Sequence, residues 1–404
     1  MAAAHEFILL AGALVLISIL AGGVGTRFNT PLLLIFLLLG VLAGEDGPGR
    51  IQFNDFQSSY LIGSVALAII LFEGGLKTER GMLRLAFWPS LTLATLGVAL
   101  TTGIVGAAAV WLFSIPWSQA LLVGAVLAPT DAAAVNTLLR TARVAVPKRV
   151  TAMLEVESGF NDPMSVFLTL LLVQNLIAPH QATVGHAVTF FLAEMAGGGL
   201  MGVLGGYALL WLLRNLPIQP SISPVLAVTS VLVVFGGAQL AGASGFLAAY
   251  VMGVVVGVNE FESRRGVVYV TEAFTWLAQI SLFLILGLLV TPHRLLPVAG
   301  PIMLITGVLV VLARPIATFV CLLPFGFSAR ETVFASWVGL RGAVPIYLTI
   351  IPVLAGFKED GTILFGATFG VVVVSLVVQG WTIAPVARLL GFRHKVAASP
   401  RSPW

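Results

Sequence analysis

One apolar stretch carries several side chains whose oxygens could bind a cation. The sequence EVESGFNDPMSVFLTLLL places Glu157, Ser158, Asn161 and Asp162 close together. In a helix, residues four apart share a face, so Glu157 lies beside Asn161 and Ser158 lies beside Asp162 on adjoining stripes. Carboxylate, hydroxyl and amide oxygens suit hard cations such as Na⁺ or K⁺. The stretch therefore predicts a monovalent cation site at Asp162.

Two arginines lie in other apolar stretches and affect the role of these carboxylates. Arg314 falls within VLVVLARPIATFV and Arg341 within VGLRGAVP. Glu157 is a natural partner for either arginine. A buried carboxylate that is paired with arginine stays ionised, whereas an unpaired one takes up a proton more readily. We therefore expect Glu157 to be structural and Asp162 to exchange a cation for a proton.

The composition indicates which kind of element positions these groups. Of 404 residues, 58% are hydrophobic and 9% are charged, whereas a soluble domain carries about 25% charged residues. The mean hydropathy is +1.04, and the apolar residues come in blocks of about 20, enough to cross roughly 30 Å of hydrocarbon as a helix. The single cysteine, Cys321, excludes a disulfide framework within the chain. The sequence therefore predicts an all-α polytopic membrane protein that is not an enzyme and needs no cofactor.

Apolar blocks separated by polar, Gly or Pro residues predict about thirteen transmembrane helices. Their expected ranges are 6–24, 30–44, 59–76, 86–113, 117–139, 150–177, 184–213, 221–240, 243–258, 267–290, 295–325, 330–355 and 361–391. Residues 1–391 then form one transmembrane domain, and 392–404 form a short basic cytoplasmic tail.

The positions of the basic residues predict the orientation in the membrane. Of the 21 Lys and Arg residues, only Arg50, Arg294 and Lys358 fall in predicted outer loops, and Arg314 and Arg341 fall inside helices. The others, including Arg27 and the tail, fall on the opposite side. Because cytoplasmic loops carry the excess of Lys and Arg, the N-terminus is predicted outside and the C-terminus in the cytoplasm. The basic residues then face anionic membrane lipid, and no nucleic-acid partner is expected.

Two predicted helices, 117–139 and 330–355, contain Pro or Gly together with a charge near their middle. The first contains Asp131 in APTDAAA, and the second contains Arg341 in GLRGAVP. Both are expected to unwind at mid-membrane, which frees backbone carbonyls such as that of Thr130 to face an ion. Paired broken helices indicate the inverted repeat of a transporter. Two unrelated proline kinks are the alternative.

The motifs together resemble a known family. Glu157–Pro163, with the sequence ESGFNDP, is similar to the E-S-x-x-N-D signature of NhaP-type monovalent cation:proton antiporters, a class that includes the eukaryotic sodium/proton exchangers. Ala128–Asp131, Phe72–Leu76 and Gly339–Ala343 are similar to further motifs of that family, in the same order. The likeness covers essentially all the predicted helices and is strongest to bacterial potassium/proton antiporters of the inner membrane.

The resemblance implies roles for particular residues. It implies that Asp162 binds the cation or proton, and the supporting residues that carry over are Asn161, Thr130, Ser158 and Asp131. It implies a structural ion pair between Glu157 and Arg314. Arg341 and Glu73 carry over as further supporting candidates.

The resemblance also implies a fold and a mechanism. The fold is that of NhaA and NhaP, with broken crossing helices. Core helices at about 86–177 and 295–391 move against dimerisation helices at about 6–76 and 184–290 in an elevator-type cycle, and two copies form a homodimer. Several potassium/proton antiporters carry a cytosolic regulatory domain after the last helix, so we expect this chain either to be truncated before one or to belong to a member without one.

One titrating carboxylate beside Asn161 holds one cation or one proton, so 1:1 electroneutral exchange is expected. The alternatives are a cation channel-like protein and a transporter of an anionic solute. A channel needs a continuous polar pore, whereas these charges concentrate near one depth. An anion transporter would use Arg314 and Arg341, but carboxylates outnumber them at mid-membrane. The residues leave the choice between K⁺ and Na⁺ open.

Overall fold

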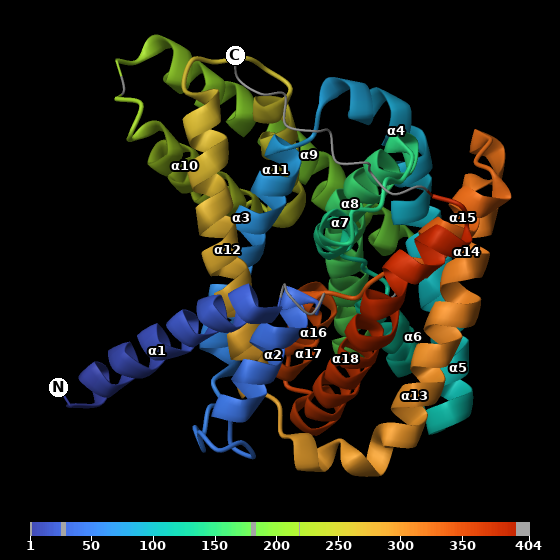
Figure 1. Cartoon of the computed structure of the whole chain (residues 1–404). Coiled ribbons are helices and arrows are strands. Elements are labelled where there is room, and N and C mark those ends of the chain that lie inside the picture. The colour runs from blue at the N-terminus through green and yellow to red at the C-terminus, as the bar shows by residue number, and fades with distance from the viewer. Residues whose placement is uncertain (1, 26–29, 179–182, 218, 393–404) are drawn as a thin grey trace.

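The computed structural model describes residues 2–25, 30–178, 183–217 and 219–392 (Figure 1), and every regular element within them is helical. The predicted all-α fold class is therefore confirmed. In the described residues, ten helices are long and apolar enough to cross a membrane, and Leu32–Ala43, Gly245–Gly257 and Ala343–Leu354 are shorter apolar helices. The number of crossings stays a prediction. Arg27 and the predicted basic tail, apart from Phe392, lie outside the described residues.

The helices form two groups that face each other across the middle of the molecule (Figure 1). The first group consists of α1 (Ala2–Gly25), α2 (Leu32–Ala43), α3 (Phe56–Leu76), α9 (Val184–Asn215), α10 (Ser223–Leu240), α11 (Gly245–Gly257) and α12 (Arg264–Leu288). The second group consists of α4 (Arg80–Thr92), α5 (Val98–Phe113), α6 (Trp117–Leu127), α7 (Ala132–Thr141), α8 (Lys148–Ile177), α13 (Ala299–Gly307), α14 (Arg314–Leu322), α15 (Ala329–Trp337), α16 (Ala343–Leu348), α17 (Ile350–Leu354) and α18 (Lys358–Leu389). Short α16 and α17 also contact α3.

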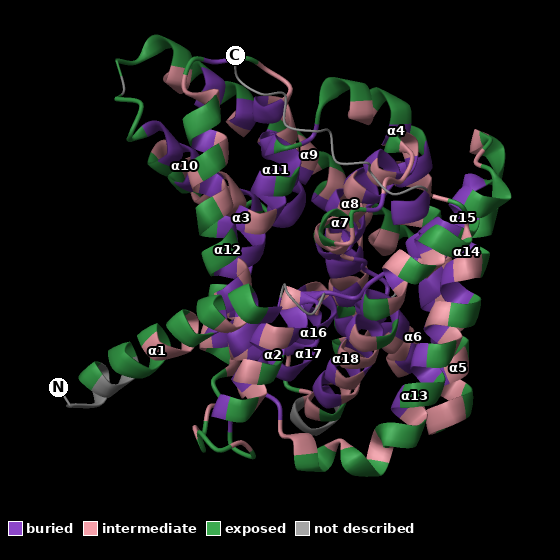
Figure 2. Cartoon of the chain, in the orientation of Figure 1, coloured by how far each residue is buried: buried purple, intermediate pink, exposed green. Residues whose placement is uncertain are grey.

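Small residues allow the helices of the first group to pack closely. Gly198, Gly202 and Gly206, spaced four apart on α9, face α11, where an added Cβ would overlap Ser244, Ala248 or Val255. Buried residues are concentrated where the helices meet, and exposed residues cover the outer faces (Figure 2). Without water to drive helix association, close backbone packing of this kind holds membrane helices together.

The two predicted helix breaks are present. Residues 128–131 separate α6 from α7, and residues 338–342 separate α15 from α16. The second break ends earlier than the sequence suggested, because Pro345 lies within the first turn of α16, where proline needs no amide hydrogen. The helices that precede them contain π-helical segments, η2 (Leu93–Gly97) and η6 (Val308–Ala313). The same irregularities therefore recur in both halves of the chain.

Some helices extend beyond the predicted ranges. The helix predicted to begin at residue 86 begins at Arg80, and those predicted to begin at 150 and 361 begin at Lys148 and Lys358. These added turns carry charged residues, which a search for apolar blocks excludes. Short 3-10 segments, Pro292–Arg294, Leu296–Val298 and Leu323–Phe325, connect helices in the second half.

Candidate cation site

The first break, residues 128–131, and the second break, residues 338–342, are joined by a hydrogen bond between their backbones. The amide N of Asp131 donates to the carbonyl O of Leu340 at 2.8 Å. Asp131 also caps α7, since its Oδ1 accepts from the backbone N of Ala134 at 2.9 Å. A Cβ at Gly342 would overlap the Asp131 side chain, so glycine is needed for this close approach. The crossing therefore fixes one oxygen of Asp131 at the start of a helix, where the positive end of the helix dipole favours a negative charge.

Two side chains near the middle of α8 form hydrogen bonds with the first break. Ser158 Oγ donates to the carbonyl O of Thr130 at 2.9 Å, and Asn161 Nδ2 donates to Thr130 Oγ1 at 2.8 Å. Asn161 is fully buried and its Oδ1 has no partner in the described residues. The Thr130 carbonyl, expected from the sequence to be free for an ion, is thus already engaged by Ser158, although an oxygen with two lone pairs can accept a second interaction.

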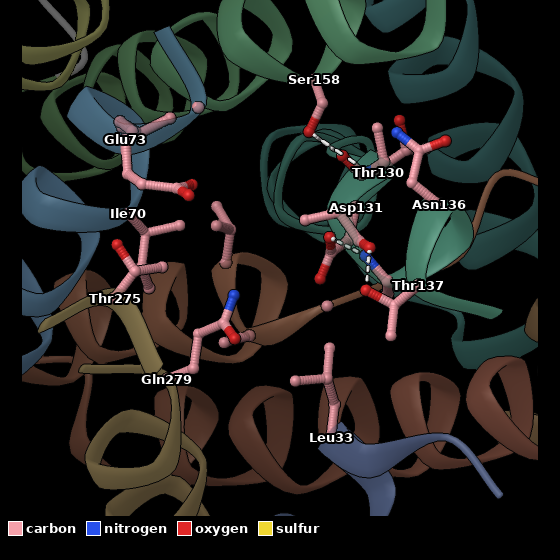
Figure 3. Close-up of a pocket in the computed structure, with 18 of the residues that line it drawn as sticks. Leu33, Ile70, Glu73, Thr130, Asp131, Asn136, Thr137, Ser158, Thr275 and Gln279 are labelled. Atoms are coloured by element: carbon pink, nitrogen blue, oxygen red, sulfur yellow. Dashed lines mark hydrogen bonds between the residues drawn. The ribbon is translucent and has the colours of Figure 1, made fainter. Parts of the chain in front are cut away.

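Asp162 differs from these neighbours. Within the described part of the chain, neither oxygen of its carboxylate has a hydrogen bond or an ion pair. Asp162 lines a cavity of about 420 Å³ together with Asp131, Thr130 and Ser158. Figure 3 shows Asp131, Thr130 and Ser158 on one side of this cavity and Glu73 on the opposite side. The structure thus brings several of the predicted site residues around one cavity.

Glu157 directly precedes Ser158 on α8, and both of its carboxylate oxygens accept hydrogen bonds. Arg314 Nη1 and Nη2 donate to its two oxygens at 2.5 and 2.9 Å. Glu157 is 1% exposed and Arg314 is 4% exposed. A Cβ at Gly339 would overlap the Arg314 side chain, so the second break also positions this arginine. The planar guanidinium matches a carboxylate with two parallel hydrogen bonds, which is the strongest form of this pair.

Arg341, the other candidate partner, does not bond to Glu157 in the described structure. Its Nη1 donates to the carbonyl oxygens of Ala128 and Pro129 at 2.5 and 2.9 Å, and its backbone N donates to Ser375 Oγ at 3.1 Å. These carbonyls follow the end of α6. A cation there interacts favourably with the negative end of the helix dipole. Arg341 therefore ties the second break to the first.

The cavity continues from the breaks to a charged mouth. Lys77 pairs with Glu73 on α3 and with Glu272 on α12, the latter at 3.3 Å. Asn136 Nδ2 donates to Glu155 Oε1 at 2.7 Å on the facing side. The sequence analysis missed the roles of Lys77 and Asn136. Lys77 follows the FEGGL motif, four residues after Glu73, and that spacing was the available signal.

The chain matches the family described as sodium/hydrogen exchanger, transmembrane, over residues 13–389. The chain belongs to this family. It is 44% identical over 390 residues to the K(+)/H(+) antiporter NhaP of Alkalimonas amylolytica, covering 96% of this chain and 68% of that one. It is 43% identical over 388 residues to the K(+)/H(+) antiporter NhaP2 of Shewanella sp. strain ANA-3, covering 95% and 67%. This exchanger-family chain thus spans about two thirds of the length of these relatives.

A more distant sequence relative and a solved structure also match this chain. The Na(+)/H(+) antiporter NhaP of Pseudomonas aeruginosa is 29% identical over 361 residues, covering 84% of this chain and 82% of that one. The solved structure of the sodium proton antiporter MjNhaP1 from Methanocaldococcus jannaschii at pH 8 superposes with a TM-score of 0.82 at 21% identity, covering 95% and 98% of the two chains. The NhaP-like fold expected from the sequence is therefore confirmed.

Proposed function

We propose that this protein exchanges a monovalent cation, K⁺ or Na⁺, for H⁺ across a bacterial inner membrane. The observation that carries the proposal is the unpaired Asp162 carboxylate on the cavity, next to the fully paired Glu157. A cation and a proton compete for the same carboxylate, so binding one displaces the other. The names of the relatives at 44% and 43% identity favour K⁺ as the cation.

The ligands we assign to the cation are oxygens that line the cavity. Asp162 supplies the exchangeable charge, and Asp131 and Ser158 supply further oxygens from the first break and from α8. Thr130 and Asn161 hold the break against α8 through their hydrogen bond. Oxygen ligands around an unpaired carboxylate are the chemistry that a hard monovalent cation requires.

The transport cycle that we assign is an elevator in a homodimer. Helices within 86–177 and 295–391 form the moving core, and those within 6–76 and 184–290 form the dimerisation scaffold. The location of the cavity between α3 and α12 on one side and the two breaks on the other supports this division. Because Asn161 is neutral and Glu157 stays paired, one charge is exchanged in each direction and transport is electroneutral.

The direct test is exchange in proteoliposomes loaded with a pH-sensitive dye. With an acidic interior, external K⁺ or Na⁺ should dissipate the pH gradient in the wild type, and Asp162→Asn should abolish this response. Turnover should generate no current on a solid-supported membrane. Stalled exchange in the wild type would refute the antiporter, and a current in proportion to turnover would refute 1:1 stoichiometry.

The matched control is Glu260→Gln. It removes one carboxylate from an exposed position that does not line the cavity. This variant should exchange at the wild-type rate, so that loss of transport in Asp162→Asn reports on the site rather than on the loss of any negative charge. Undiminished transport by Asp162→Asn would overturn the assignment of the site.

A further inference from the structure

Lys77 occupies a position at the mouth of the cavity that the proposed exchange does not explain. It directly follows α3, and its backbone N donates to the carbonyl oxygens of Glu73 and Gly75. Its ammonium contacts the Glu73 carboxylate and lies 3.3 Å from Glu272 Oε1. The Lys77 side chain is 42% exposed, whereas that of Glu73 is 11% exposed. The ammonium is thus held between the solvent and a largely buried carboxylate.

The charges that face Lys77 come from both sides of the cavity. On its own side are Glu73 and Glu272, and across the cavity are Glu155 and Arg140. Glu155 accepts a hydrogen bond from Asn136. Among the described lining residues, Lys77 and Arg140 are the basic ones, and only Lys77 pairs with Glu73. At this end of the cavity, an internal ammonium therefore already occupies the carboxylate of Glu73.

A lysine ammonium resembles the transported ion in the features that matter for this carboxylate. It is a compact, strongly hydrated monovalent charge, and its four-carbon stem lets it move while it remains attached to the chain. The lysine ammonium and the transported cation therefore both interact with a glutamate as point charges. An arriving cation must share or replace the ammonium at Glu73 before it continues towards Asp162.

We propose that Lys77 is a tethered competitor of the transported cation at Glu73 and so sets the apparent affinity of the exchanger for that cation. This inference rests on the proposed antiport. Removing the ammonium leaves the two nearby carboxylates uncompensated, which raises the local concentration of cations. The stronger attraction of the carboxylates also slows release of the cation through the mouth. Both the half-saturating concentration and the maximal rate should therefore fall. Because the Lys77 side chain is 42% exposed, solvent screens its pairing with Glu73, and the Lys77 variants should fold.

The first experiment compares Lys77→Met with Lys148→Gln in proteoliposomes. Lys77→Met should lower the half-saturating concentration of K⁺ or Na⁺ by roughly fivefold, as expected for loss of a partly exposed ion pair. Lys148 is exposed at the start of α8 and does not line the cavity, so its replacement controls for the overall charge of the surface. An equal effect of both substitutions would overturn the inference, because it would place the effect in the surface potential.

A second experiment restores the charge in the same folded protein. Cys321 is the single natural cysteine and is fully buried, so a Lys77→Cys variant can be modified selectively at the exposed position. Attachment of a thiol-linked ethylammonium group should return the half-saturating concentration towards the wild-type value, whereas attachment of an uncharged methyl group should not. Equal effects of the two reagents would show that size rather than charge matters and would overturn the proposal.

A double substitution tests whether the competition takes place at Glu73. In a Glu73→Gln background the competitor has lost its carboxylate, so adding Lys77→Met should change the half-saturating concentration far less than in the wild type. An undiminished effect would contradict the assignment to Glu73. Wild type and Asp162→Asn are measured alongside. Asp162-dependent exchange with an unchanged half-saturating concentration in Lys77→Met would refute only the role of Lys77, whereas absence of exchange in the wild type would refute the antiporter itself.

Discussion

Glu157 and Asp162 lie on the same helix, α8, and differ in what faces them. Glu157 is 1% exposed and receives both of its hydrogen bonds from Arg314. Asp162 has no such partner among the described residues and lines the cavity. The difference is supplied by other helices, since α14 brings an arginine to one carboxylate and the crossing of the breaks leaves space beside the other.

This difference separates charge that stabilises the fold from charge that can be exchanged. Burying an ion pair costs desolvation free energy. The hydrogen bonds between the two partners offset that cost, but only while both partners are present. An unpaired carboxylate that lines a cavity has no such dependence on one neighbour. A third carboxylate, Glu331, extends the comparison, because it pairs with Arg149 at the start of α8, near the end of the bundle.

The largest expected effect comes from removing the partner of Glu157. Arg314→Met leaves a buried carboxylate without compensation, which should destabilise the fold by about 3–5 kcal/mol. Thermal unfolding of the purified protein in detergent should show a large drop in Tm. Glu157→Gln combined with Arg314→Met removes both charges and should recover part of the loss.

Asp162→Asn provides the contrast in the same measurement. Because Asp162 has no described ion-pair partner, its neutral variant should unfold at the wild-type temperature or above it. If Arg314→Met and Asp162→Asn lowered Tm equally, the distinction between a structural and an exchangeable carboxylate would be lost.

Two glycines of the second break allow a sharper test. An added Cβ at Gly339 would overlap the Arg314 side chain, and one at Gly342 would overlap the Asp131 side chain. Each alanine should cost about 1–3 kcal/mol, the usual range for overpacking. Gly339→Ala should act mainly on Tm through the Glu157 pair, whereas Gly342→Ala should also raise the half-saturating cation concentration through Asp131.

The readouts that check this are Tm and cation dependence measured on both variants. Gly236→Ala is a suitable control, because nothing lies within 4 Å of an added Cβ at that position. Identical changes in cation dependence for Gly339→Ala and Gly342→Ala would show that the second break responds as one unit and that the two carboxylates are not separately supported.

Much of the fold could be predicted from the sequence, for physical reasons. Hydrocarbon requires long apolar helices, so apolar blocks mark them, and Pro or Gly beside a charge marks the breaks at 128–131 and 338–342. The ends of helices were predicted less well. Charged first turns such as the one that begins at Arg80 belong to a helix without being apolar.

Local pattern predicted the residues of the candidate site but not their pairings, and only the family resemblance pointed to Arg314 as the partner of Glu157, which the structure shows. Arg314 and Arg341 occupy similar apolar contexts, and Glu157 is far from both in the chain, so local pattern could not choose between them. The choice depends on how α14 crosses α8, which is a tertiary property. The position of Lys77 over Glu73 follows from helical spacing, whereas its contact with Glu272 depends on how α12 packs against α3.

The smallest expected effect concerns Glu331, the paired carboxylate at the end of the bundle. Hydrogen bonds from the Arg149 guanidinium lower the pKa of Glu331 to about 2, with further help from Ser328. Its ordinary pKa is about 4.3, so the pair should contribute stability above about pH 5 and lose it as the pH falls towards 2. Glu331→Gln should therefore reduce stability by about 1 kcal/mol at neutral pH, measured as Tm.

The pH dependence of the Tm difference between wild type and Glu331→Gln distinguishes an effect of the ion pair from an effect of packing. As the pH falls from about 5 towards 2, wild type should lose the advantage and its Tm should approach that of Glu331→Gln, because protonation removes the charge that the substitution removes. Glu262→Gln, at an exposed position, should give no such convergence. A constant gap between wild type and Glu331→Gln would mean that Glu331 acts through the hydrogen bonds it accepts from Ser328, just before α15, and not through Arg149. The contrast with Asp162 would then rest on the buried Glu157–Arg314 pair.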